Sequence, residues 1–271
     1  MKFWVRAFAG AHRIPASLGE SKNPPSLRRQ LTINLYSVSK VIGHRRFQRT
    51  IARDVTWTIE PRSKYVILSH QPAALSVFVN IIAGLSIPSE GWVKPEGKIS
   101  PPGGFLRYSK GGTPPELIKL LAPLYRFDAD QVIDFVAATV QYDRLLRTPT
   151  GQLPIALRRE LNLALTFAIP CDHYFFVGMP NGGRSQFRKI CQQALARRSE
   201  EAAVVVGAGS DRVARSLGPD AKAAILYRGN FTLYQRLDDA LAVFERLEPE
   251  AAIPNEALED ENYEDDVDLV I

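Results

Sequence analysis

Long apolar runs and cysteines are scarce in this sequence. No stretch of the 271 residues approaches the roughly 20 apolar residues that a helix needs to span a bilayer. Arg6 interrupts the short apolar start, so we expect no signal peptide there. The chain has two cysteines, Cys171 and Cys191, and both lie in segments that we expect to be buried. These features favour a globular protein of a reducing compartment over a membrane-spanning or disulfide-stabilised one.

Each end of the chain nearly lacks charges of one sign: acidic residues are scarce at the N-terminal end and basic residues are absent at the C-terminal end. Residues 1–64 are rich in Lys and Arg and contain three acidic residues, Glu20, Asp54 and Glu60, whereas Lys and Arg are lacking from Glu256 onward. A basic arm can bind nucleic acid or anionic lipid. No aromatic residues alternate with the basic ones as in single-strand binding proteins, so we expect no nucleic-acid partner.

The middle of the chain has the composition of a folded domain, with 45% hydrophobic and 23% charged residues overall. Pro, Ser, Gly and Arg dominate residues 1–30, which predicts a flexible basic arm. We expect one domain over residues 31–250 and an acidic, disordered tail over residues 251–271.

The central stretch, Lys64 to Leu85, predicts a strand, a tight turn and a helix. Tyr65 to Leu68 is a short β-rich apolar run, apolar residues then recur at helical spacing, and Gly84 stands where a helix would end. A nucleotide-binding P-loop has this layout, with G-x-x-x-x-G-K-[ST] at the turn. Here that position reads Ser69-His70-Gln71-Pro72-Ala73-Ala74-Leu75-Ser76. Only Ser76 matches, since Ser69 and Ala74 replace the glycines and Leu75 replaces the lysine.

Residues 31–247 resemble an ABC-transporter nucleotide-binding domain, most closely the capsular polysaccharide export ATPases. The segments that carry the resemblance are Asn34 to Lys40 (like "V-S-K"), Asp54 to Ile59 (like "D-V-S-F-x-I"), Ile81 to Leu85, Ile87 to Gly91 (like "P-x-x-G") and Arg188 to Cys191 (like "F-K-x-K-C"). The resemblance implies an α/β P-loop NTPase-like fold of the ABC ATPase type. Its parts would be an antiparallel β-subdomain, a mainly parallel core sheet flanked by helices, and an α-helical subdomain at about residues 113–160.

Within the helical subdomain, the spacing of apolar residues predicts helices over 116–125 and 129–146, the second with Asp128 as its N-cap. The family's signature reads roughly "Y-S-S-G-M-R-x-R-L-x-F-A-L". Here its helix is retained in Arg158, Leu161, Ala164 and Leu165, but its turn is Pro154-Ile-Ala-Leu157. Pro154 has neither the hydroxyl nor the N–H group that the family offers to the γ-phosphate.

The other positions that the resemblance assigns to catalysis are substituted too. Ile42 stands for the aromatic residue that stacks on adenine, and Leu106 for the Q-loop glutamine, which is lacking from Gly103 to Pro115. Val177 and Gly178 replace the Walker B carboxylates, Gly183-Arg184 stands for the D-loop "G-D", and no histidine follows His173 to act as the switch. Carboxylates at the Walker B positions hold magnesium and orient the attacking water.

These losses predict a non-catalytic ABC-ATPase-like subunit or regulator of a capsular or surface polysaccharide exporter. We expect no bound cofactor or metal, although ATP and magnesium serve the parent family. The expected partners are a membrane permease subunit, on whose cytoplasmic face the protein would dock, and an active ATPase paralogue or a second copy.

Two other functions stay open. One is an ATP-hydrolysing exporter subunit. The other is a soluble binding protein that reuses the fold, with His70, Gln71 and Ser76 as its ligand cluster. The ordinary interpretation of those three residues is that they are polar groups of an exposed loop.

The surface that we expect to serve the function is the groove between the core and the helical subdomain. In the family this groove receives a helix of the membrane subunit. We place it near Phe105, Leu106 and Tyr108. Alternatively, Phe105 and Leu106 simply close the core beneath the Gly-rich segment.

Overall fold

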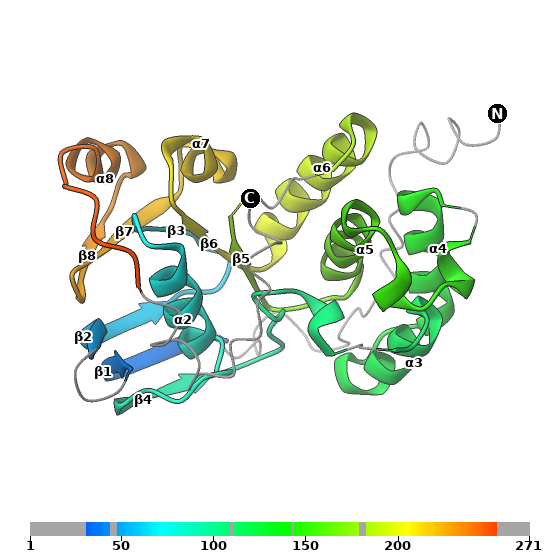
Figure 1. Cartoon of the computed structure of the whole chain (residues 1–271), viewed down its shortest axis with the longest axis horizontal. Helices are drawn as coiled ribbons and strands as arrows, with labels where there is room; N and C mark the ends of the chain where they lie inside the picture. The colour runs from blue at the N-terminus through cyan, green and yellow to red at the C-terminus, as the bar shows by residue number, and fades with distance from the viewer. Residues whose placement is uncertain (1–30, 44–47, 109–110, 143, 179–182, 254–271) are drawn as a thin grey trace, which may run out of the picture.

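The computed structural model describes residues 31–43, 48–108, 111–142, 144–178 and 183–253, drawn in colour in Figure 1. The predicted arm over residues 1–30 and residues 254–271 of the predicted tail lie outside this part. Residues 251–253 are described, and Ile253 is buried. The packed domain therefore extends slightly beyond the predicted boundary at residue 250.

An antiparallel sheet of three strands forms one side of the molecule (Figure 1, blue and blue-green). Its strands, in the order β2-β1-β4, are β1 (Ile33–Ile42), β2 (Arg49–Ile59) and β4 (Glu90–Pro95). Alternating apolar residues from Leu31 and the β-rich run from Val55 to Ile59 predict two opening strands, and both are present. β2 begins at Arg49, well before the predicted start at Val55, because its first half pairs with the second half of β1.

A β-bulge midway along β1 changes which residues of the strand face the core. Odd-numbered residues do so before the bulge and even-numbered residues after it. Ile33 and Leu35 are buried, as the alternating pattern predicts, but Ser37 has a φ of 48° and the pairing with β2 shifts register after Leu35. Beyond the bulge the buried positions are Val38, Lys40 and Ile42. An inserted residue moves every following side chain to the other face. The bulge thus keeps both halves of an apolar strand on the core.

The second sheet has five strands in the order β5-β6-β3-β7-β8. Its first four strands are parallel, and β8 pairs antiparallel with β7. The strands are β3 (Lys64–Leu68), β5 (His173–Val177), β6 (Ala203–Ala208), β7 (Lys222–Tyr227) and β8 (Asn230–Tyr234). Apolar runs without alternation, such as Ala203 to Val206, form the inner strands because parallel strands are buried on both faces.

Each face of this sheet supports its own apolar cluster. Alternate residues of β3 divide between them, with Val66 and Leu68 in one cluster and Tyr65 and Ile67 in the other. The first cluster joins the sheet to the helical subdomain, and the second joins it to the antiparallel sheet and α2. A strand's side chains alternate between faces, so β3 links both halves of the molecule.

Seven α-helices lie within the described residues, and α3, α4 and α5 form the helical side of the molecule at the right of Figure 1. They are α2 (Pro72–Ile82), α3 (Pro114–Tyr125), α4 (Ala129–Val140), α5 (Ile155–Ala168), α6 (Ser185–Glu201), α7 (Asp211–Ala214) and α8 (Leu237–Phe244). Short 3-10 turns occur at Phe105–Tyr108, Leu145–Arg147, Thr150–Gln152 and Arg215–Leu217. None of the helices in the described part of the chain is long and apolar enough to cross a membrane.

The helix predicted over residues 129–146 is shorter than expected. Asp128 caps its start as predicted, because its carboxylate accepts hydrogen bonds from the N–H groups of Asp130 and Gln131. The helix ends at Val140, where Gln141 takes a left-handed conformation with a φ of 50°. The apolar spacing continues in the separate 3-10 turn that contains Leu145, which is why the sequence overestimates the helix.

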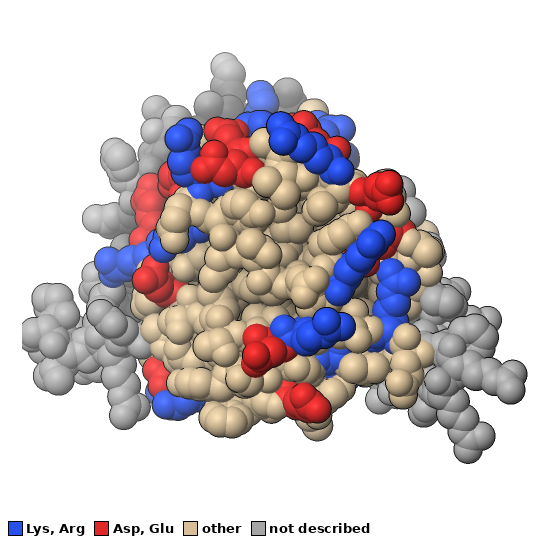
Figure 2. Space-filling model, turned by 90° about the vertical axis from the view of Figure 1, so that its left-hand side faces the viewer, with Lys and Arg blue, Asp and Glu red and all other residues tan. Residues whose placement is uncertain are grey.

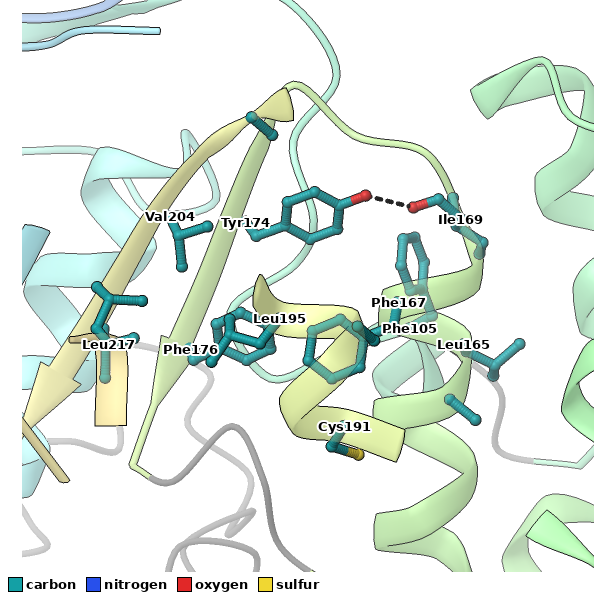
Figure 3. Close-up of a cluster of buried hydrophobic side chains, with 14 of the residues drawn as sticks. Phe105, Leu165, Phe167, Ile169, Tyr174, Phe176, Cys191, Leu195, Val204 and Leu217 are labelled. Atoms are coloured by element: carbon teal, nitrogen blue, oxygen red, sulfur yellow. Dashed lines mark hydrogen bonds between the residues drawn. The ribbon is translucent and has the colours of Figure 1, made fainter. Parts of the chain in front are cut away.

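Figure 3 shows the cluster that joins the sheet to α5 and α6. The hydroxyl of Tyr174 on β5 donates to the carbonyl of Ile169, at 2.9 Å, so this buried phenol is satisfied. Cys191 is 1% exposed in the same cluster, and burial raises the pKa of its thiol to about 12. Cys191 is therefore a neutral core residue, as predicted, and Cys171 is partly buried and also not in a disulfide.

Trp57 forms the seam between the two sheets. Its ring lies edge-on to Tyr65 of β3, with centroids 5.0 Å apart, and 5.1 Å from the ring of Phe231 on β8. It is 5% exposed. Trp92 on β4, by contrast, is 62% exposed and stacks on Tyr36. The two sheets are thus joined by aromatic packing.

Candidate functional site

The strand–turn–helix unit predicted from the sequence is present, but its turn is short. β3 ends at Leu68 and α2 begins at Pro72, so the turn consists of Ser69, His70 and Gln71. The N–H of Ser69 donates to the carbonyl of Ala208, and the N–H of Gln71 donates to the Ser69 hydroxyl. A P-loop binds phosphate through backbone N–H groups of this turn. Two of the three turn amides are already hydrogen-bonded within the protein.

Leu75, which the resemblance places at the P-loop lysine, lies inside the core. Leu75 is 2% exposed, and its Cδ2 lies 3.5 Å from where a Cβ on Gly207 of β6 would be. Ala74, at the second glycine position, is also buried, and Ser76 is partly buried on α2. Position 75 thus directs an apolar side chain against the sheet, where a lysine would have to present an ammonium to a phosphate.

The remaining two predicted ligand residues contact the C-terminal part of the chain. The ring of His70 stacks on Phe244 of α8, with centroids 4.0 Å apart and an interplanar angle of 12°. The Gln71 side chain is 4% exposed, and its Nε2 donates to the carbonyl of Ala251 at 2.6 Å. His70 and Gln71 are therefore not the exposed loop residues of the alternative interpretation.

β5 and β6 are the strands at whose ends the resemblance places the metal carboxylates and the switch histidine. β5 ends at Val177, and the N–H of Gly178 donates to the carbonyl of Gly207. β6 runs to Ala208 and is followed by Gly209. No group of three or more His, Cys, Asp or Glu residues able to hold a metal occurs in the described ranges. Ile42, at the adenine-stacking position, is 2% exposed and belongs to the core.

The segment at the Q-loop position is fixed to the helix that follows the signature turn. Asn162 of α5 donates through Nδ2 to the carbonyl of Gly103 and accepts through Oδ1 from the N–H of Leu106, at 2.7 and 3.1 Å. A Cβ on Gly104, whose φ is 76°, would lie 2.2 Å from the Asn162 amide. Only glycine allows this approach. The signature turn itself starts α5 at Ile155 without a side-chain cap.

The predicted docking residues do not share one environment. Phe105 has no exposed surface and lies edge-on to Tyr125 of α3, with centroids 5.2 Å apart. Leu106 is partly buried against the same cluster. For Phe105 the structure agrees with the second of the two interpretations, in which it closes the core. Tyr108 falls in the 3-10 turn, and its side chain lies outside the described part.

The sequence analysis missed an ion pair near the D-loop position in which only the acidic partner is buried. The Glu160 side chain on α5 is 2% exposed, and Arg184 donates to it through its backbone N–H, Nε and Nη2. Arg184 Nη2 also donates to the carbonyl of Val140, the last residue of α4. Hydrogen bonding to Glu160 raises the pKa of Arg184. The pair joins the end of α4 and the start of α6 to the interior of α5.

The family patterns could have indicated this pair. In the signature pattern an arginine stands at the position of Glu160, and in the D-loop pattern an aspartate stands at the position of Arg184. Both charges are reversed in this chain. A reciprocal exchange of charge at two positions indicates contact between them, because each single reversal would bury an unpaired charge.

Comparison with known structures decides the fold. No protein-family model matches the sequence. A solved ATP-binding subunit of an ABC transporter superposes with a TM-score of 0.61 at 15% identity, covering 84% of this chain and 98% of that one. The ABC cassette MJ0796, in a dimeric post-hydrolysis state with ADP and phosphate, gives 0.60 at 18% identity, covering 76% and 98%.

The chain has the fold of an ABC-transporter ATP-binding cassette.

Similarity in sequence to characterised proteins points to one group of ABC cassettes. The capsule polysaccharide export ATP-binding protein CtrD of Neisseria meningitidis is 23% identical over 216 residues, which cover 79% of this chain and 99% of that protein. The polysialic acid transport ATP-binding protein KpsT of Escherichia coli is 24% identical over 183 residues, covering 66% and 83%. The cassette is thus similar, at low identity, to ATP-binding subunits of capsule polysaccharide exporters.

Proposed function

We propose that this cassette is a non-catalytic subunit or regulator of a capsular or surface polysaccharide exporter. It would dock on the cytoplasmic face of the membrane subunit and pair with an active ATPase or with a second copy. The single observation that carries the proposal is the burial of an apolar leucine against β6 at position 75. The link to polysaccharide export rests on the similarity to CtrD and KpsT.

The size of the expected catalytic loss supports this choice. A charge-assisted hydrogen bond to phosphate contributes about 1.5–3 kcal/mol. One electrostatic donor to a transition state contributes on the order of 10²–10³ in rate. The lysine, both Walker B carboxylates, the Q-loop glutamine and the switch histidine are all replaced. Their effects would not simply add, but the loss exceeds what residual positioning can supply.

The second candidate is an ATP-hydrolysing exporter subunit. The names of the relatives favour it, since CtrD and KpsT are both described as ATP-binding proteins and CtrD is matched over nearly its whole length. This candidate needs a cation at the phosphates and a carboxylate for magnesium. Neither occurs at the equivalent positions, 75, 177 and 178.

Calorimetry with ATP and magnesium separates the two candidates. We expect the wild-type chain to show no micromolar, magnesium-dependent binding, whereas KpsT prepared identically provides the positive control. Weak binding of sulfate or phosphate at the start of α2 is compatible with the proposal. Micromolar binding of ATP that requires magnesium, or phosphate release above the background of a heat-inactivated sample, would establish the second candidate instead.

A further inference from the structure

After α8 the chain turns back to the turn between β3 and α2. In Figure 1 the orange-red segment descends from α8 toward the start of α2. Phe244 stacks on His70, and the carbonyl of Ala251 accepts the hydrogen bond from the Gln71 side chain. These residues are about 180 positions apart in sequence. Two of the three residues of the turn are thus held by the C-terminal part of the domain.

Glu250 anchors this returning segment. Its side chain is 6% exposed, and Oε1 lies 3.3 Å from Arg49 Nη2 at the start of β2. The same oxygen accepts a hydrogen bond from the backbone N–H of Arg228, in the turn between β7 and β8, at 3.1 Å. A buried carboxylate is stable only when donors replace its water. Glu250 therefore fixes the segment to both sheets.

Ile253 completes the attachment. It is 8% exposed and belongs to the same apolar cluster as Ala74 and Leu75 of α2 and Ile42 of β1. Ala251 and Ala252, between the two anchors, are exposed and small. A carboxylate and an aliphatic side chain three positions apart thus hold this short segment at both ends.

We propose that residues 250–253 form a strap that is an intramolecular ligand of the turn between β3 and α2. The strap engages Gln71 and joins the antiparallel sheet to the core, so it closes the element that in P-loop proteins receives phosphate. This inference goes beyond the proposed function and rests on different residues: the strap could close the turn of an active or an inactive cassette.

Hydrogen exchange of the full-length protein tests the strap. The test variant is Glu250→Ala, and the matched control is Glu248→Ala, an exposed acid two residues earlier. Loss of a hydrogen bond to a charged group corresponds to roughly a tenfold change in an opening equilibrium. We therefore expect about tenfold faster exchange of the amides of residues 69–76 in Glu250→Ala, and wild-type exchange in Glu248→Ala. Ile253→Asp should act like Glu250→Ala.

The exchange at residues 69–76 is the informative signal, because the N–H of Arg228 loses its acceptor in Glu250→Ala under any interpretation. If residues 69–76 exchange at the wild-type rate in both strap variants, the strap does not close the turn and the inference is overturned. If they exchange faster while the wild type binds ATP with magnesium, the strap stands and the non-catalytic function fails. The two failures are therefore distinguishable.

Discussion

At the scale of single residues, substitution of Leu75 measures how much of a phosphate site this fold retains. Its side chain fills space against β6, so Leu75→Lys should place an ammonium in an apolar cluster. We expect this variant to show no ATPase activity and to be less stable by about 2–5 kcal/mol, the range for disruptive substitutions of buried leucines. Chemical denaturation and a phosphate-release assay measure the two effects.

The controls are Leu75→Ala, which creates a cavity without a charge, and Leu75→Met, which nearly conserves volume and should cost below about 1.5 kcal/mol. Turnover in Leu75→Lys above that of Leu75→Ala would mean that the turn can still bind phosphate. Unchanged stability of Leu75→Lys would place the side chain outside the core.

The Glu160–Arg184 pair makes a second prediction at this scale. Removing Arg184 leaves a carboxylate buried without its main partner, so Arg184→Ala should lower the unfolding free energy by about 2–3 kcal/mol. Arg184 is 57% exposed, and solvent screening keeps the loss below that of a fully buried pair.

The exchange of both charges, Glu160→Arg with Arg184→Glu, should recover part of the stability that either reversal loses alone. A double-mutant cycle measures this coupling. Additive losses in the cycle would show that the pair is an incidental contact and that the family patterns do not report it.

At the scale of elements, Asn162 connects α5 to the segment at the Q-loop position. Asn162→Ala removes one donor and one acceptor from partly buried backbone groups, and we expect a loss of about 1–3 kcal/mol. Asn162→Asp keeps the acceptor for Leu106 but places a carboxylate oxygen against the Gly103 carbonyl, where two acceptors repel, so its loss under neutral conditions should be at least as large as that of Asn162→Ala. Thermal or chemical unfolding gives both values, and equal stability of the three proteins would contradict the role of this clamp.

Element types were predictable from the sequence where the apolar pattern was simple. The unit of β3 and α2 follows from a β-rich run, helical spacing and Gly84, whose φ of 73° ends the helix. The length of β2 and the end of α4 were not predictable. The first depends on pairing with β1 across a bulge, and the second on a left-handed Gln141 that apolar spacing does not encode.

The environment of the predicted site residues could not be decided from the sequence. The sequence left open whether Phe105 closes the core, and it gave no sign that Gln71 bonds to Ala251. Both facts depend on segments distant in the chain. Long-range contacts of this kind have no local sequence signal.

At the scale of the whole molecule, charged side chains are unevenly distributed over the end seen in Figure 2. Figure 2 shows the end that carries β8 and α8, with charged side chains mostly around the margin and uncharged ones over much of the centre. Leu233 on β8 is 46% exposed. This end of the molecule has no continuous basic surface among its described residues, and the expected absence of a nucleic-acid partner stays a prediction.

Docking on a permease is the prediction for the whole molecule. Leu106→Asp and Tyr108→Glu, in the 3-10 turn beside the helical subdomain, should abolish co-sedimentation with membranes that contain the exporter. Leu233→Asp, an exposed leucine of β8 at the other end of the molecule, is the control and should remain bound. Cooperative thermal unfolding must be retained in all three variants, because Leu106 also packs on the core.

Retention of the two turn variants on the membrane, or absence of the wild type from it, would contradict docking through this surface. Exposed apolar side chains on α3 offer a second location, since Leu120 and Leu124 are 62% and 69% exposed. Leu120→Asp distinguishes that location if the turn variants still bind.

The contrast between Trp57 and Trp92 has a spectroscopic consequence. Trp57 lies in the seam between the sheets, whereas Trp92 faces solvent on the outer strand of the smaller sheet. A buried indole emits at shorter wavelength than a hydrated one, so the two side chains contribute separable parts of the intrinsic fluorescence. With Trp92→Phe and Trp4→Phe, the remaining emission of Trp57 would follow the docking of one sheet on the other during refolding. The fluorescence of Trp57 thus reports on the folding of the chain.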